Sequence, residues 1–393
     1  KYYEKHHNVK ITDAAVEQAV KLSIKYMADK KLPDKAIDII DCAAARYKLK
    51  DDATMDGVEQ LVDVEQVVYE LSKMINMPLE SVAQKESKNL ADLENGMKTS
   101  VYGQDTAVNT LLDKIFVAQA GMKSPNKPIG SFLFLGPTGT GKTELALQLS
   151  KSMGQQLVRF DMSEYQEQHK VASLIGSPPG YVGYSDGSSG SGKLINEIEK
   201  NPNCVLLLDE IEKAHPSVIN VFLQLMDAGI VTGSDGKTVN GRNIVLIMTS
   251  NLGAADAEKN SIGFSGGKVT GSEDKEMKRF FTPEFRNRLD GIIKFNKLDK
   301  TVIINIVNKF INEMNGQLSE RNLKLTLDKQ ALTWLIDNGY NETMGARPLK
   351  RLIATEIKQP LSKKILFSSD YKNLNIKLCR TKTGWDFKET KRR

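Results

Sequence analysis

The stretch GPTGTGKT, residues 136–143, constrains the fold of this 393-residue chain more than any other feature. It matches the pattern G-x-x-x-x-G-K-[ST] in full, follows the apolar run SFLFL at 131–135, and precedes an amphipathic helical pattern. Glycines in such a loop let backbone N–H groups surround phosphates, and the following helix adds the partial positive charge of its N-terminus. The sequence therefore predicts a nucleotide-binding loop between a strand and a helix, with a chance glycine-rich turn as the alternative.

The loop supplies eight candidate ligands for the nucleotide. Lys142 is expected to reach the β- and γ-phosphates of ATP, and Thr143 is expected to ligate Mg²⁺. The other residues contribute backbone N–H groups or the shape of the turn. The predicted nucleotide-binding residues of the loop are Gly136, Pro137, Thr138, Gly139, Thr140, Gly141, Lys142 and Thr143.

A second motif, VLLLDE at 205–210, places two carboxylates directly after four apolar residues. The apolar run predicts a buried strand, so Asp209 and Glu210 would emerge at its carboxyl end, beside the phosphate loop. Asp209 is expected to hold Mg²⁺ through water, and Glu210 to polarise the attacking water as a general base. A solvated acidic pair is the alternative interpretation. Because both motifs fall in one predicted sheet, the sequence indicates an enzyme that hydrolyses a nucleoside triphosphate.

The apolar runs around these motifs indicate the fold class. Short runs alternate with amphipathic helical patterns, which predicts βαβ units and a parallel sheet with both faces covered. After the run at 292–295, helical patterns and a terminal hairpin pattern follow. We therefore expect an α/β fold, a P-loop NTPase with a parallel sheet, followed by a smaller α+β C-terminal domain. The expected strands are 131–135, 157–161, 204–209 and 243–251, and the expected later helices are about 299–318, 328–338 and 345–366.

Composition bears on the cellular compartment and on the classes of binding partner, and says little about the fold. The chain has 40% apolar and 26% charged residues and a formal charge of +6, which is a weak hint of an acidic ligand and no indication of DNA or membrane binding. Cys42, Cys204 and Cys379 lack metal-ligand spacing, which favours a reducing compartment. No apolar run approaches the roughly 18 residues that span a bilayer, and the start, KYYEKHHNVK, has no signal-peptide pattern. We expect a fragment of a longer protein of the bacterial cytoplasm, with an organelle matrix as the alternative, and with no nucleic-acid or membrane partner.

Four further polar residues are candidates for contact with a nucleotide. Asn251 ends the strand pattern IVLIMTSN and would orient water between Glu210 and the γ-phosphate, or else cap the local turn. Arg286 and Arg288 follow a Pro-started helical turn in FTPEFRNRLD, and Arg347, in GARPLKR, suits the first turn of a helix. An arginine presented to a γ-phosphate raises the rate by roughly 10³ to 10⁵. Taken singly, however, these arginines favour surface salt bridges as the interpretation.

Together, these motifs resemble, in order and spacing, the second AAA+ module of the Clp ATPases. The shared features are the phosphate loop, LLLDEIEKAHP, the strand-end Asn, FTPEFRNRLD and GARPLKR. The resemblance runs from about Val101, in VYGQDTAV, to about Phe367, and residues 1–50 resemble the tail of a preceding first module. The implied division is 1–60 for that helical tail, 61–100 for a connector, 101–290 for a large ATPase subdomain and 291–393 for a small C-terminal subdomain.

The resemblance implies a homohexameric ring with ATP between subunits. In such a ring, Arg288 would act on a neighbour's nucleotide, with Arg286 as the less favoured candidate. Arg347 would act as the second sensor of the chain's own nucleotide, and Val101 and Tyr102 would line the adenine pocket. The implied cofactors are ATP and Mg²⁺.

The segment GSPPGYVGY, 176–184, resembles the pore loop of this family. Glycines on both sides favour mobility, and Tyr181, followed by Val182, supplies a large amphipathic ring. Six such loops in an axial channel would grip an extended chain of almost any sequence, while a tyrosine in an ordinary turn is the alternative. The neighbouring stretch DGSSGSG, 186–192, is typical either of a natural loop or of an artificial linker.

Two features bear on the type of Clp ATPase. Disaggregases of the family carry a long coiled-coil insertion after the segment matched here by AIDIIDCAAARYKLK, whereas DDATMDGVEQLVDVEQVVYEL follows here almost at once, which favours the ClpA type. Ile262, Gly263 and Phe264 resemble the tripeptide with which protease-coupled members dock onto the ClpP peptidase ring, although the usual ClpA form is Ile-Gly-Leu. A weak anchor on a flexible tether gains strength through multivalency. A local clasp onto the same subunit is the alternative.

The expectation is an ATP-dependent unfoldase and translocase that threads unfolded or tagged proteins through a hexameric pore into ClpP, with adaptor proteins as further candidate partners. The chain would be an ATPase and not itself a peptidase, since the sequence offers no plausible Ser/His/Asp set. A ClpB-like disaggregating chaperone acting without a protease is the alternative. A nucleic-acid motor would need a basic channel with stacking aromatics, and Tyr181 lies among glycines and prolines without clustered Lys or Arg.

Overall fold

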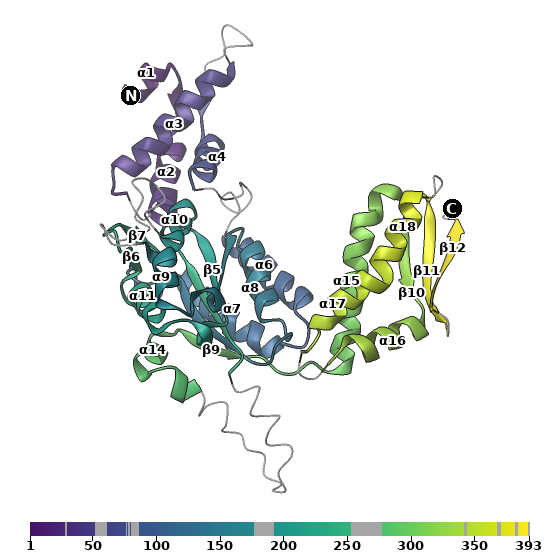
Figure 1. Ribbon diagram of the computed structural model, residues 1–393. Coiled ribbons are helices and arrows are strands. Elements are labelled where there is room, and N and C mark those ends of the chain that lie inside the picture. Colours follow the sequence, from purple (N-terminus) through teal and green to yellow (C-terminus); the bar gives the residue numbers. More distant parts are fainter. Residues whose placement is uncertain are drawn as a thin grey trace.

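The computed structural model describes most of the chain, which forms three packed units (Figure 1). We call residues 2–77 the N-terminal unit, residues 86–294 the central unit and residues 300–391 the C-terminal unit. Tyr181 and Val182 of the predicted pore loop and the tripeptide at 262–264 lie outside the described residues. The described residues are 1–27, 30–51, 61–75, 77, 79, 86–176, 192–252, 277–341, 344–367, 371–381 and 384–391, of which 47–51 and 86–92 are described by their backbone only.

The N-terminal unit is a helical bundle with one short pair of parallel strands. Thr12 begins its second helix, because the Thr12 hydroxyl oxygen accepts a hydrogen bond from the N–H of Ala15 at 3.0 Å. Its elements are α1 (Tyr2–His7), β1 (Lys10–Ile11), α2 (Asp13–Tyr26), α3 (Asp34–Asp51), β2 (Leu61–Val62) and α4 (Val64–Met74).

Helix α4 belongs to this bundle rather than to a connector. Its residues Val67 and Leu71 are fully buried in the same core as Ile39 of α3. Strand β2, just before it, pairs with β1 in the register Lys10 to Leu61. The packed unit therefore extends beyond the predicted boundary at residue 60, because the apolar face of α4 forms part of its core.

The central unit is built on a five-stranded, wholly parallel sheet. The strand order is β4–β5–β8–β3–β9, so β3, which leads into the phosphate loop, lies between β8 and β9. The parallel sheet that the apolar runs predicted is thereby confirmed. The strands are β3 (Gly130–Leu135), β4 (Gln156–Asp161), β5 (Cys204–Asp209), β8 (Val245–Ser250) and β9 (Gly291–Lys294).

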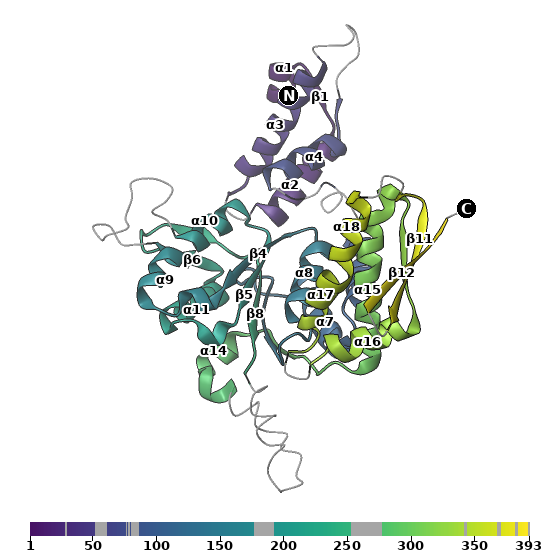
Figure 2. The ribbon, with the colours of Figure 1, turned by 45° about the vertical axis from the view of Figure 1, so that its right-hand side comes forward.

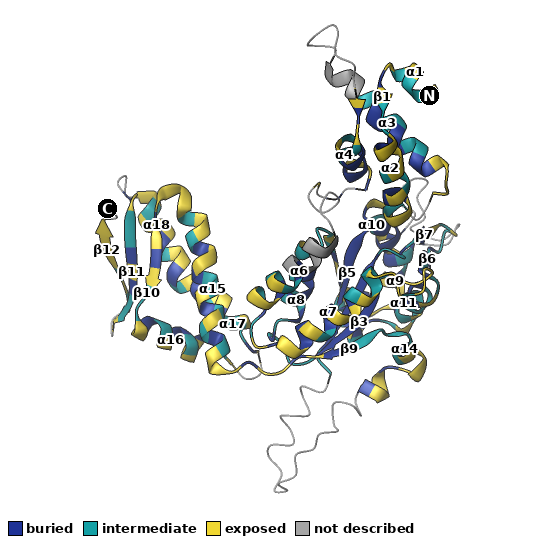
Figure 3. Cartoon of the chain, turned by 180° about the vertical axis from the view of Figure 1, so that it is seen from behind, coloured by how far each residue is buried: buried dark blue, intermediate teal, exposed yellow. Residues whose placement is uncertain are grey.

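Helices cover both faces of this sheet, whose three inner strands, β5, β8 and β3, are almost entirely buried (Figure 3). Successive side chains point to opposite faces, so Leu133 and Leu135 of β3 pack in one core and Phe132 and Phe134 in the other. The Phe-side helices are α6 (Glu86–Ser100), α7 (Asp105–Gln119) and α8 (Lys142–Ser152). The Leu-side helices are α9 (Gln168–Ile175), α10 (Lys193–Lys200), α11 (Pro216–Ala228) and α14 (Pro283–Arg288). Short elements complete the unit: η1 (Met162–Tyr165), η2 (Ile211–Lys213), β6 (Ile230–Thr232) and β7 (Thr238–Asn240).

The central unit ends later than predicted, because it includes strand β9 (Gly291–Lys294). The predicted boundary lay between residues 290 and 291. The last residue of β9, Lys294, pairs with Leu135 of β3, and Ile293 is buried in the same core as Phe134. The four residues of β9 are an edge strand of the central sheet, so they precede rather than open the C-terminal unit.

The C-terminal unit packs helices against a three-stranded sheet (Figure 2). The middle strand, β11, runs parallel to β10 and antiparallel to β12. Ile303, Leu349 and Ile376 bring helices and sheet together in one core, which confirms a smaller α+β domain after the parallel sheet. Its elements are α15 (Lys300–Leu318), η4 (Ser319–Arg321), β10 (Lys324–Leu327), α16 (Lys329–Gly339), α17 (Arg347–Ile353), the π-helical turn η5 (Ala354–Lys358), α18 (Gln359–Phe367), β11 (Leu374–Thr381) and β12 (Gly384–Lys391).

Helix α15 is amphipathic rather than apolar throughout. Ile303, Val307 and Ile311 are buried on one face, while Lys300 and Glu313 are exposed. Among the described residues, no helix combines the length and the apolar content that crossing a bilayer requires.

Candidate nucleotide-binding site

A cavity of about 630 Å³ lies at the carboxyl end of the central sheet, between the central and the C-terminal units. The phosphate loop from Thr138 to Thr143, the acids Asp209 and Glu210, and Asn251 line it from the central unit. Ala346 and Arg347 line it from the C-terminal unit. The structure therefore brings most of the predicted site residues to one place.

The backbone of the phosphate loop has the conformation that a bound polyphosphate needs. Gly139 and Gly141 have φ values of +72° and +105°, which side chains rarely allow, and Gly141 directly precedes α8. The N–H groups of Gly139, Thr140 and Gly141 have no hydrogen-bond acceptor among the described residues. Unpaired N–H groups beside a helix N-terminus form an anion site. The loop therefore fits the phosphates of a nucleotide.

Lys142 is buried at the base of the cavity, with 8% of its surface exposed. Its Nζ donates hydrogen bonds to the carbonyl oxygens of Gly136 and Pro137 and to Asn251 Oδ1, the last at 2.8 Å. Burial lowers the pKa of Lys142 to about 8, although Glu212 and the other nearby carboxylates oppose the shift. The ammonium group is thus held by neutral oxygens at the place where phosphates would arrive.

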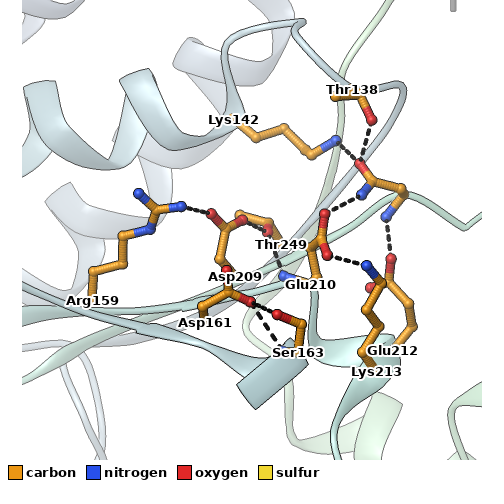
Figure 4. A network of polar contacts seen from close by, with 11 residues as sticks. Thr138, Lys142, Arg159, Asp161, Ser163, Asp209, Glu210, Glu212, Lys213 and Thr249 are labelled. Atoms are coloured by element: carbon orange, nitrogen blue, oxygen red, sulfur yellow. Dashed lines mark hydrogen bonds and ion pairs between the residues drawn. The ribbon is translucent and has the colours of Figure 1, made fainter. Parts of the chain in front are cut away.

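Both acids of the second motif contact Thr249, because β8 runs next to β5 (Figure 4). The Thr249 hydroxyl of β8 donates a hydrogen bond to Asp209 Oδ1 and accepts one, at 3.1 Å, from the N–H of Glu210. Glu210 itself has φ +57° and ψ +52°, a left-handed conformation that is unusual for a glutamate. This turn directs the chain away from the sheet directly after Asp209.

Basic side chains that the sequence did not identify pair with both acids (Figure 4). Arg159 of the edge strand β4 lies 2.6 Å from Asp209 Oδ2, and Lys213 lies 2.5 Å from Glu210 Oε2. Asn251 Nδ2 lies 3.4 Å from Glu210 Oε1. The only sequence signal for Arg159 was its place in LVRFD, two residues before a strand end, which says nothing about the strand beside it.

The predicted adenine-pocket residues line the same cavity. Val101, 4% exposed, and the half-buried Tyr102 lie between α6 and α7. Gln104, which the sequence did not single out, follows them and ties three segments together. Its Nε2 donates to the carbonyl oxygen of Asn296 at 2.8 Å and to that of Thr140 at 3.3 Å.

Arg347 reaches the cavity from the C-terminal unit. It is the first residue of α17, as the Gly-Ala-Arg-Pro sequence predicted. The preceding turn touches the phosphate loop directly, since Ala346 N–H donates to Gly139 O at 3.2 Å. Arg347 is exposed, and its side chain makes no hydrogen bond or ion pair with another described residue. Its predicted contact with the nucleotide stays a prediction.

Arg288 and Arg286 do not line the cavity. Arg288, at the end of α14, lies 2.5 Å from Asp227 of α11 and 2.7 Å from Glu284. Arg286 Nε donates to the carbonyl oxygen of Phe281 at 3.2 Å. Both therefore stand apart from the nucleotide cavity of their own chain, and a role for Arg288 toward a neighbour's nucleotide stays a prediction.

A phosphate loop after β3, acids after β5 and a polar strand end at β8, in this strand order and followed by a helical C-terminal unit, define the class of AAA+ ATPases. Residues 127–292 match the family described as an AAA domain of the Cdc48 subfamily. Residues 1–94 match an AAA lid domain, and residues 298–377 match the C-terminal, D2-small domain of ClpB protein. The chain belongs to the Clp ATPase family.

Curated relatives and solved structures agree with this assignment. A ClpA homolog protein of Fuscovulum blasticum is 47% identical over 93% of this chain and 45% of its own length. ClpE of Lactococcus lactis is 38% identical, over 95% of this chain and 56% of its own length. A cryo-EM structure of Hsp104 with ATPγS and casein matches with a TM-score of 0.75 and 32% identity, over 99% of this chain and 66% of that one. The chain spans about half the length of the curated relatives it matches.

Proposed function

We propose that the protein containing this chain is an ATP-driven unfoldase and translocase, which forms a homohexamer and pulls proteins through its central pore. The observation that carries the proposal is the position of the nucleotide cavity between two separately packed units. A nucleotide there would touch both, so binding, hydrolysis and release would change how the units sit together. This couples chemistry to movement.

Contacts at the rim of the cavity support this coupling. Lys309 of α15 lies 2.6 Å from Glu144 of α8 and donates to the carbonyl oxygen of Ser100 at 3.0 Å. Gln104 joins the phosphate loop to Asn296, in the segment between the two units. Through these contacts, a movement of the phosphate loop would be transmitted to the C-terminal unit.

The cavity's residues suit ATP hydrolysis. We assign Lys142 to the β- and γ-phosphates, Glu210 to the attacking water as general base, and Asn251 to the orientation of that water. Thr143 and Asp209, both lining the cavity, supply the oxygen atoms that Mg²⁺ prefers. Mg²⁺, when bound, neutralises charge on the phosphate oxygens.

We further propose that the substrate is an extended protein chain gripped by Tyr181 and Val182, and that Ile262, Gly263 and Phe264 dock the ring onto ClpP. The comparisons support a ClpA-like type. The alignments with ClpE and with Bacillus subtilis ClpC/MecB run over 426 and 441 residues, which exceeds this chain of 393, whereas the alignment with the ClpA homolog covers 366. ClpE and ClpC therefore carry residues inside the aligned region that this chain lacks. We place the assembly in the cytoplasm, where free thiols such as that of Cys204 stay reduced.

A ClpB-like disaggregating chaperone that acts without a protease is the second candidate. The match of residues 298–377 to the ClpB small domain and the likeness to Hsp104 favour it. It would use the same motor and have no need of the tripeptide.

The test is degradation of a folded, tagged protein by the full-length protein with ClpP and ATP. Wild type is compared with a variant carrying Ile262→Ser and Phe264→Ser, with ATP hydrolysis measured in parallel. Loss of degradation with unchanged ATP hydrolysis supports docking through the tripeptide. Unfolding of the tagged protein by wild type without degradation favours the disaggregase, and an absence of unfolding contradicts both.

A further inference from the structure

Glu212 is a third carboxylate beside the nucleotide cavity, and neither motif assigns it a role. It lies in the turn η2, two residues after Glu210. Its Oε1 accepts a hydrogen bond from the backbone N–H of Asn251 at 3.0 Å (Figure 4). Its Oε2 is buried and has no hydrogen-bond donor among the described residues.

A partly buried carboxylate with one buried oxygen left without a donor is costly for a fold. Leaving a charged oxygen without a donor destabilises the folded state more than an apolar replacement would. Glu212 is therefore poorly explained as a contribution to stability. Its one described hydrogen bond points instead to the residue that it holds, Asn251.

Asn251 is the first residue after β8, where the regular strand hydrogen bonds have ended. Its side chain stands between two groups of the proposed reaction: Lys142 Nζ at 2.8 Å and Glu210 Oε1 at 3.4 Å. Both contacts depend on how the backbone is turned at this position. The hydrogen bond that this backbone N–H donates to Glu212 is the described contact that fixes it there.

We propose that Glu212 is a positioning residue of the hydrolytic site, which orients Asn251 so that its amide joins Lys142 to Glu210. The inference rests on the proposed ATP hydrolysis and deepens it. Glu212 touches neither nucleotide nor water in this role and acts only through Asn251. The carboxylate also couples η2, the turn that follows the general base, to the end of β8, so the two move as one.

The first test measures backbone protection, which is independent of ATP turnover. In the nucleotide-free full-length protein, hydrogen exchange is followed in a peptide covering residues 245–252. Glu212→Ala should speed exchange of one amide by at least about tenfold, because an amide that loses its acceptor is protected less. Glu212→Gln, whose side-chain oxygen can still accept the bond, should leave the amide protected. Unchanged exchange in Glu212→Ala would overturn the assignment.

The second test is a double-mutant cycle on ATP hydrolysis. Glu212→Ala should lower kcat between about tenfold and a hundredfold, as misplacement of a reacting group does, with KM and fluorescent ADP binding within about twofold. In an Asn251→Ala background the same change should add less than about twofold, because the two residues act as one unit. An equal loss in both backgrounds would mean that Glu212 acts independently of Asn251.

The control is Glu167→Ala, which removes an exposed glutamate of the central unit, paired with His169 at 3.2 Å, and should change neither readout. If Glu212→Ala fails to fold, Glu212→Gln replaces it in the double-mutant cycle. The glutamine keeps the hydrogen bond to Asn251, so kcat should stay within about threefold of wild type. Wild type that hydrolyses ATP without unfolding proteins would refute the proposed function and leave the cycle informative. Wild type without any ATP hydrolysis would refute the catalytic part of the inference, and the exchange experiment would still decide whether Glu212 holds Asn251.

Discussion

The backbone N–H of Ala346 donates a hydrogen bond to the carbonyl oxygen of Gly139 at 3.2 Å, so the C-terminal unit rests directly on the phosphate loop. The contact is close because two glycines meet there. A side chain on Gly345 would lie 2.6 Å from the carbonyl oxygen of Thr138 and 2.7 Å from that of Gly139. The turn that carries Arg347 is thus seated on the loop that would hold the phosphates.

Gly345→Ala should therefore weaken the contact between this turn and the phosphate loop. Gly345 has φ +57°, where alanine is disfavoured by about 1–2 kcal/mol, and the added methyl group must also push the turn away from the loop. We expect nucleotide affinity to fall roughly tenfold or more, measured by titration with a fluorescent ADP. Gly316→Ala is the matched control, because its added methyl group meets open space within α15 and should, if anything, stabilise the helix. Equal nucleotide affinities of the two variants would show that the contact between the turn and the phosphate loop does not support nucleotide binding.

Glu210→Gln should separate binding from hydrolysis. The amide keeps the size of the side chain but cannot take a proton from water, so turnover should fall by about 10² to 10⁴. Nucleotide binding should stay within about twofold, since Lys142 and the loop N–H groups are untouched. Glu199→Gln, which alters an exposed ion pair with Lys237, is the control for loss of a glutamate charge. Turnover at the wild-type rate would remove Glu210 from its role.

Nucleotide affinity should depend on alkaline pH through Lys142. Burial lowers the pKa of its ammonium group to about 8, so the group is charged below that pH and increasingly neutral above it. Phosphates favour the charged form, so binding above pH 8 requires uptake of a proton. Affinity should be constant from about pH 7 to 8 and then fall, approaching tenfold per pH unit. Lys142→Arg, which stays charged, should show no such fall, and a flat wild-type curve to about pH 9.5 would refute the linkage.

Local motifs made the reactive residues predictable. The phosphate loop and the acids after β5 carry their geometry within a few residues, so Lys142, Asp209 and Glu210 meet where the sequence placed them. The contact between Arg159 and Asp209 was not predictable, because it depends on β4 lying beside β5, and strand order is a property of the whole sheet. The short strand β9 was assigned to the wrong side of a boundary for the same reason, since four residues gain their place only by pairing with β3.

The role of Glu212 also needed the structure. The sequence places it two residues after the general base, where no motif gives it a role. Its direction follows from the left-handed backbone of Glu210, which turns the chain so that Glu212 faces the end of β8. No residue pattern encodes that turn, because left-handed glutamates are uncommon.

Arg288 should act on the nucleotide of a neighbouring subunit. It lies outside its own cavity, held by Asp227 and Glu284, so its removal should leave nucleotide binding intact while hydrolysis by the ring falls by about 10³ or more. Arg286→Ala is the control and should cost far less, because the hydrogen bond that its side chain makes within the described residues goes to the carbonyl oxygen of Phe281.

Mixing two inactive proteins tests whether Arg288 acts across the subunit boundary. Arg288→Ala subunits keep the general base, and Glu210→Gln subunits keep the arginine, so a mixed ring contains boundaries at which both groups are present. ATP hydrolysis should reappear on mixing and vary with the ratio of the two proteins, while each alone stays inactive. If mixed rings form, as judged by light scattering, and remain inactive, Arg288 does not serve a neighbour. Its pairing with Asp227 and Glu284 would then be its whole role, and Asp227→Asn together with Glu284→Gln should destabilise the fold as much as Arg288→Ala does.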